Sequence, residues 1–127
     1  MTKPYVEGRV AYDKTPITEI IARCPLQFKR MPVGRSDVNK YYLTEGKGDL
    51  FRLVMISQLE ESSSRYLSPN DHNIIITVFG RSQKVVREGL EDVLEKIKIE
   101  TRPAPPELVK TWDKLAGLYE QFLTQLH

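Results

Sequence analysis

Cysteine is nearly absent from this chain, which has only Cys24 among its 127 residues. A single cysteine cannot form an intrachain disulfide, so we expect a fold that does not depend on oxidation. The first ten residues contain no apolar run, which predicts that there is no signal peptide. No stretch approaches the ~20 apolar residues of a membrane span. We therefore expect a cytoplasmic or other intracellular, reducing compartment and no membrane partner.

Groups that carry catalysis are also few. The two histidines, His72 and His127, have no cysteine or carboxylate at a spacing typical of metal ligands. Cys24 is predicted to lie on the apolar side of a helix, where a buried thiol is inert. The serines at 62–64 lack the Gly-x-Ser-x-Gly setting of an activated nucleophile. We expect no enzyme activity, no metal and no cofactor.

Neither sign of charge dominates, because 19 basic and 17 acidic side chains give a net charge of +2. The distribution is uneven: residues 1–56 carry ten Lys/Arg and six Asp/Glu, a net of +4. Such an asymmetry can attract an anion, although solvated surface charge also explains it. The densest basic stretch, opposed only by Asp37, consists of Arg23, Lys29, Arg30, Arg35 and Lys40.

Hydrophobic periodicity predicts an α+β fold with an antiparallel sheet of four to five strands and helices packed on one face. The expected strands cover residues 5–12, 26–30, 40–44, 50–56 and 73–79, with a polar loop over 57–73. Thr15 and Ser82 are expected to cap helices that end near Pro25 and Lys98. Residues 73–79 are uninterruptedly apolar, which is typical of a central strand.

A long amphipathic helix is expected at the C-terminus, after the proline-rich connector 102–106. We divide the chain into an α+β domain over 1–102 and this hinged helix over 103–127. Its apolar residues recur in steps of 4 and 3, as in an a/d pattern. They are Leu108, Trp112, Leu115, Tyr119, Phe122 and Leu126. We favour packing on the chain's own sheet or preceding helix, but the proline hinge would also allow packing on a second subunit.

Basic and aromatic residues alternate over residues 26–54, and this pattern is typical of proteins that bind single-stranded nucleic acid. Cationic side chains follow the phosphates while aromatic faces stack on bases. Tyrosine and phenylalanine are also common in strands for packing alone, so an ordinary solvated sheet remains an alternative. The candidate binding residues are Lys29, Arg30, Arg35, Lys40, Tyr42, Lys47 and Arg52.

Residues 40–97 resemble a PUR repeat, a family related to the whirly proteins. The resemblance rests on Lys40–Leu43, Gly46–Val54, the strand Ile74–Phe79 and the helix Val85–Ile97. It implies a curved sheet with helices behind it that binds single-stranded DNA or RNA. It also implies that Tyr42, Lys47, Phe51 and Arg52 lie near the ligand. The loop over 57–73 and the terminal helix depart from a simple repeat.

Three functions follow from these observations. The first is a non-catalytic regulatory module that binds single-stranded DNA or RNA. The alternative is a protein-interaction or assembly factor (adaptor, inhibitor or chaperone) that acts through the C-terminal helix, on a protein partner or in a homodimer. The third, a small enzyme, would need a deep polar pocket that unites Arg81, Ser82 and His72.

Overall fold

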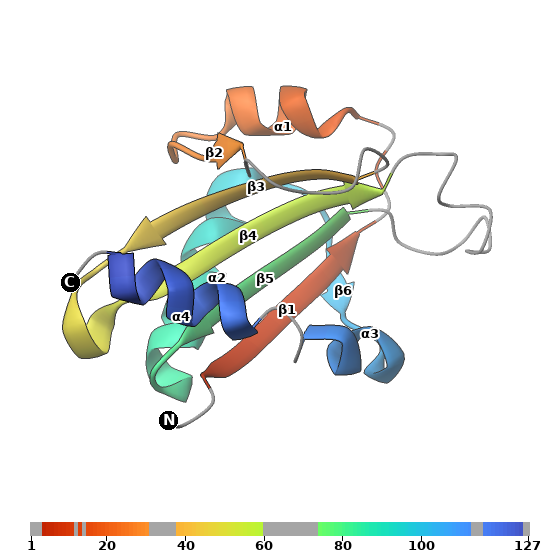
Figure 1. The fold of residues 1–127 in the computed structure, drawn as a ribbon. Coiled ribbons are helices and arrows are strands. Elements are labelled where there is room, and N and C mark those ends of the chain that lie inside the picture. The colour runs from red at the N-terminus through yellow and green to blue at the C-terminus, as the bar shows by residue number, and fades with distance from the viewer. Residues whose placement is uncertain are drawn as a thin grey trace.

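The computed structural model describes residues 4–11, 13, 15–30, 38–59, 74–112 and 116–125. Its first seven helices and strands follow the predicted order β-α-β-β-β-β-α, apart from a short 3₁₀ helix in one turn (Figure 1). The elements are β1 (Tyr5–Ala11), α1 (Ile17–Arg23), β2 (Lys29–Arg30), β3 (Val38–Glu45), η1 (Gly48–Leu50), β4 (Arg52–Leu59), β5 (Ile74–Gly80), α2 (Gln83–Ile97), β6 (Arg102–Pro103), α3 (Pro106–Thr111) and α4 (Ala116–Gln125).

The strands form one antiparallel sheet in the order β2-β3-β4-β5-β1-β6. The α+β class and the antiparallel sheet are thereby confirmed. The sheet has six strands rather than four to five. The additional strand is β6, in which Arg102 and Pro103 pair with Val10 and Arg9. We had predicted only a connector there, because a two-residue strand leaves no periodicity in the sequence.

Two local predictions are confirmed. The apolar run becomes β5, which lies between β4 and β1 in the sheet. The expected strands 40–44 and 50–56 leave a turn between them, and this turn joins β3 to β4, with Gly46 at φ 78° and Gly48 at φ 59°, where a side chain would be strained. The second strand of this hairpin begins at Arg52 instead of Leu50, because Gly48–Leu50 form the 3₁₀ helix. It also extends to Leu59, so residues 57–59 are part of a strand and not of the predicted loop.

Each face of the sheet has its own hydrophobic cluster. We call them the α2 face and the α4 face, after the helix that covers each. The α2 face contributes Val54, Ile56, Ile74, Ile76 and Val78, packed under α1 and α2. The α4 face contributes Leu53, Met55 and Phe79, packed under Trp112 and Tyr119. The expectation that helices pack on one face therefore holds for α1 and α2, whereas α3 and α4 lie on the opposite face (Figure 1).

The two predicted helix caps differ in outcome. The Ser82 side chain accepts a hydrogen bond from the Val85 amide at 3.2 Å, which confirms its capping role. At α1 the N-cap residue is Pro16, without a side-chain cap, so the prediction of Thr15 was wrong. Instead, Gln58 of β4 accepts from the Ile17 amide at 2.7 Å. The first free N–H of α1 is thus satisfied by a strand distant in sequence.

The prediction of one long C-terminal helix was wrong, because the chain forms the two short helices α3 and α4. The two helices contact different parts of the sheet. Trp112 lies over Gly8 of β1, whereas Tyr119 packs on Phe51 with ring centroids 5.4 Å apart. Gly8 and Phe51 are two strand spacings and four residues apart, or about 16 Å.

Candidate nucleic-acid interface

The strand register separates the predicted nucleic-acid-binding residues. Residues opposite each other in adjacent strands share a face, as do alternate residues along one strand. Lys29 lies opposite Tyr42, which lies opposite Met55, and this places Lys29 and Tyr42 on the α4 face. Lys40, two residues before Tyr42, is on the same face. Arg30 lies opposite Tyr41 and belongs to the α2 face.

Arg52 and Lys47 are not part of this group. The Arg52 guanidinium lies on the α2 face, 3.3 Å from Glu45 and 3.9 Å from Asp92 of α2. It also fills the space beside Gly89, where a Cβ would come within 2.8 Å of the Arg52 Cδ. Arg52 therefore joins α2 to the sheet. Lys47 is in the exposed β3–β4 turn, and Arg35 lies outside the described residues.

Tyr42 does not present an open ring to a nucleic-acid base in this arrangement. Its ring packs on Phe122 of α4, with centroids 4.7 Å apart and an interplanar angle of 33°. The contact belongs to the cluster under α4, which also contains Phe51. Stacking of a base on Tyr42 would require α4 to move.

A row of side chains crosses the α4 face next to this cluster. The register aligns one residue from each of the five adjacent strands β3, β4, β5, β1 and β6, which together span about 19 Å. The row consists of Lys40, Ser57, Ile75, Val10 and Arg102. It is basic at both ends and uncharged in the middle. We call these five residues the Lys40–Arg102 row.

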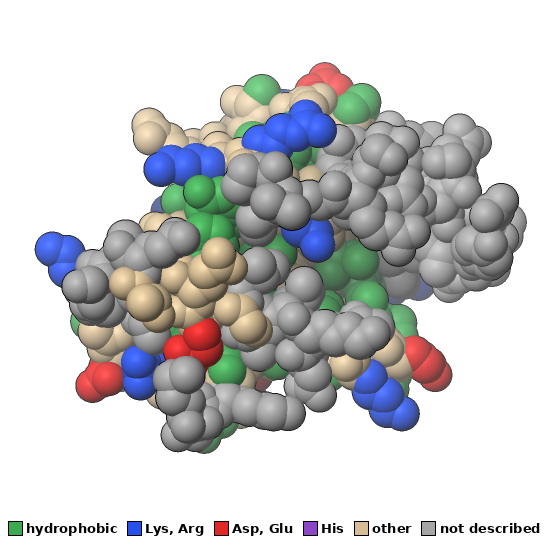
Figure 2. Space-filling model, viewed as in Figure 1, with side chains coloured by type: hydrophobic (Ala, Val, Ile, Leu, Met, Phe, Trp, Pro, Cys, Tyr) green, Lys and Arg blue, Asp and Glu red, His purple; other side chains and the backbone are tan. Residues whose placement is uncertain are grey.

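The charges on the two faces differ in kind. Among the described residues, the charged side chains that the strands place on the α4 face are all basic: Lys29, Lys40 and Arg102. In the view of Figure 2, Lys and Arg side chains stand at the upper margin of this face, with hydrophobic side chains below them. On the α2 face, acidic residues accompany the basic ones, as in the Glu7–Arg87 pair at 3.1 Å. The α4 face is thus the one suited to an anion.

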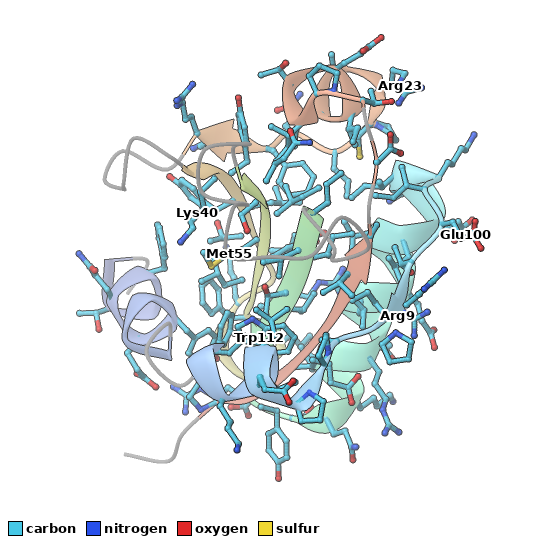
Figure 3. All side chains as sticks on the ribbon, turned by 90° about the vertical axis from the view of Figure 1, so that its right-hand side faces the viewer. Arg9, Arg23, Lys40, Met55, Glu100 and Trp112 are labelled. Atoms are coloured by element: carbon cyan, nitrogen blue, oxygen red, sulfur yellow. The ribbon has the colours of Figure 1, made fainter. Side chains whose placement is uncertain are left out.

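Lys40 is the half-buried cation of this row. Burial lowers the pKa of its ammonium group from the ordinary value. Among the described residues, no ion pair involves Lys40. Figure 3 shows Lys40 on the same side of the sheet as Met55 and Trp112, away from Arg9. A partly desolvated charge without a counterion costs stability, and such groups are enriched where a ligand binds.

Four of the six residues predicted for protein interaction pack within the chain. Trp112 and Tyr119 are buried, and Leu108 and Phe122 pack beside them on the α4 face. Leu115 and Leu126 lie outside the described residues. The described part of the a/d pattern therefore covers the chain's own sheet.

Four residues of the row were not predicted as site residues: Ser57, Ile75, Val10 and Arg102. Ser57 fell in the predicted loop and Arg102 in the predicted connector. Their common position depends on strand register, which is set by pairing between distant segments. The sequence offers no signal for the face of Ile75, because residues 73–79 are apolar on both faces of the strand.

The described part of the chain contains one cysteine and no cluster of metal-ligating side chains. Cys24 is buried as a free thiol, as predicted. No group of three His, Cys, Asp or Glu gathers there in an arrangement that could hold a metal ion. No helix in that part is long and apolar enough to cross a membrane. His72 and His127 lie outside it, so the pocket required by the enzyme hypothesis cannot be assembled from described residues.

No protein-family model, curated protein or solved structure matches this chain. The resemblance to PUR repeats stays a prediction from the sequence.

Proposed function

We propose that this chain is a non-catalytic module that binds single-stranded DNA or RNA on its α4 face, along the Lys40–Arg102 row. The observation that carries the proposal is the charge of that face. Its described strand side chains are either uncharged or basic, and Lys40 is half-buried with no ion pair to another described residue. A phosphate group would pair with this ammonium group.

The arrangement suits a flexible polyanion better than a small ligand. Lys29 and Lys40 stand near one edge of the sheet and Arg102 at the other, so a nucleic-acid strand long enough to pass over the buried Val10 would meet cations at both ends. Between them, Ile75 and Ser57 offer apolar and hydrogen-bonding contacts. Binding would depend mainly on phosphates, because Tyr42 is covered by Phe122.

Binding of a single-stranded oligonucleotide across a salt series tests the proposal. For single strands, the slope of log K against log salt is about −0.7 for each phosphate neutralised. We expect the double substitution Lys29→Gln and Lys40→Gln to reduce the steepness of this slope by about 1.4 and to weaken binding at low salt. The matched control is Arg30→Gln with Lys84→Gln, which removes two charges on the α2 side and should leave the slope unchanged.

Two results would reject the proposal. One is the absence of binding at low salt by the unsubstituted protein. The other is an equal loss of binding in the two double variants, which would indicate that net charge alone matters.

The protein-interaction alternative is less well supported by the geometry. Trp112 is 3% exposed and Tyr119 is 1% exposed, so neither is free to contact a partner. A partner could reach them only if α3 and α4 left the sheet. Deletion of residues 103–127 would remove part of the core, and a loss of binding in that variant would not identify an interface.

A further inference from the structure

The outer edge of β1 has a groove beside it, with a volume of about 320 Å³. Four consecutive residues of β1 line this groove, from Val6 to Arg9. Consecutive strand residues point to opposite faces. A groove that touches all four therefore runs along the backbone at the edge of the sheet, and not over one face.

This edge is unpaired along half of its length. β6 pairs only with Arg9 and Val10, so among the described residues Tyr5–Gly8 have a strand partner on the β5 side alone. Prolines explain why β6 is short. Pro103, Pro105 and Pro106 have no N–H to donate to a ladder, and α3 begins at Pro106. No described residue pairs with the outward-pointing backbone groups of Tyr5–Gly8, and such groups are a template for another strand.

Both sides of the groove provide contacts for the side chains of an added strand. Ala104, Val109 and Trp112 line it on the α4-face side, and Leu90 lines it from α2 on the other side. Tyr5 is 54% exposed and Val109 is 39% exposed. They are two of the three large hydrophobic side chains that are exposed in the described part of the chain, and both border this edge.

We propose that the β1 edge binds an extended peptide segment of a partner protein, which adds to the sheet as a seventh strand. Main-chain hydrogen bonds to Tyr5–Gly8 would give affinity, and alternate side chains would give specificity. The segment fits best if it carries aliphatic residues at every second position, directed toward Trp112 and Val109. The proposal is independent of nucleic-acid binding, which uses the Lys40–Arg102 row.

A second copy of this chain fits the edge less well. Two β1 strands related by a twofold axis must place a residue opposite its own copy, because opposed residues share a face. Centring on Glu7 opposes two carboxylates, and like charges in that position are destabilising. Centring on Val6 places Pro4 opposite Gly8. Because proline has no N–H to donate, only the segment Tyr5–Glu7 could then pair with its copy. A different polypeptide meets neither restriction.

The probe for this proposal is a displayed library of unconstrained twelve-residue peptides, selected against the full chain. We expect the selected peptides to show alternating aliphatic residues. Val109→Lys should weaken their binding at least tenfold, because it places a charge in the apolar wall of the groove, against the side chains of the added strand. Tyr5→Lys is a second edge variant with the same expected direction. Leu50→Lys is the matched control, since Leu50 is 68% exposed in the distant β3–β4 turn.

Several outcomes overturn the proposal. They are a selection without enrichment, binding that both edge variants leave unchanged, and binding that Leu50→Lys weakens equally. A concentration-dependent dimer that Val109→Lys dissociates would assign the edge to a second copy, and would overturn it as well. Thermal unfolding of each variant, expected to match the unsubstituted protein, shows that the fold is retained.

Discussion

Tyr119 is a buried residue whose side chain includes an unsatisfied polar group. Its side chain is 1% exposed, and its hydroxyl has no hydrogen-bond partner in the described part of the structure. Burial raises the pKa of this phenol from its ordinary value of 10.0. Arg81 lowers the pKa through its charge and as a nearby donor, although it does not reach full hydrogen-bonding geometry with the hydroxyl. The hydroxyl of Tyr119 therefore lowers the stability of the fold, whereas burial of its ring raises it.

Replacement of Tyr119 by phenylalanine should raise the free energy of unfolding by about 1 kcal/mol at neutral pH, because it removes a buried donor without a partner. The effect should grow at alkaline pH. With a raised pKa in the folded state, Tyr119 keeps its proton above pH 10 while the unfolded chain loses it, so the stability of the unsubstituted protein falls as pH rises. The variant lacks this contribution. Urea denaturation at pH 7 and above pH 10 measures the stability difference between the two proteins and its increase with pH. A variant less stable than the unsubstituted protein at pH 7 would contradict the prediction.

Gly8 and Lys40 show that the sequence reveals the chemical type of a residue but not its packing or burial. A glycine within a strand often marks a bulge or a close approach of another group, and β1 continues through Gly8. A Cβ there would overlap the Trp112 ring and lie 2.5 Å from the Ile76 carbonyl oxygen, so glycine permits close packing. The basic character of Lys40 was visible in the sequence. Its partial burial was not, because burial depends on which segments surround a strand.

At the scale of elements, predictions succeeded where the cause is local. The β3–β4 turn, the Ser82 cap and the apolar β5 each depend on a few adjacent residues. Predictions failed where the cause is a distant contact. The α1 N-terminus bonds to Gln58, β6 exists only through its pairing with β1, and the a/d pattern divides between two helices over the sheet. Periodicity identifies an apolar side of a segment but not the surface that it covers.

The α1 cap gives a direct test of this difference. Gln58→Ala should lower the free energy of unfolding by about 1 kcal/mol, since it removes the acceptor of the Ile17 amide. Thr15→Ala should have a smaller effect, because Thr15 contributes its backbone carbonyl to Gln58 and no side-chain cap to α1. Chemical denaturation of the two variants compares them. A larger loss in the Thr15 variant would restore the capping role expected from the sequence.

At the scale of the whole molecule, the two faces of the sheet differ in composition. The α2 face is closed by α1 and α2 and forms the larger hydrophobic cluster. The α4 face combines a second cluster with the Lys40–Arg102 row. Of the seven residues predicted to bind nucleic acid, Lys29, Lys40 and Tyr42 share this face. The sequence could not separate them from Arg30 and Arg52, because faces follow from register.

The most direct test of nucleic-acid binding on the α4 face is a lysine footprint. The full chain is acylated with and without a saturating single-stranded oligonucleotide of about 20 nucleotides, long enough to cover one domain, and mass spectrometry measures modification at each lysine. We predict that the oligonucleotide protects Lys29 and Lys40, and leaves Lys84 and Lys98 as reactive as in the free protein. Protection of Lys84 and Lys98 with Lys29 and Lys40 unchanged would contradict the proposed interface.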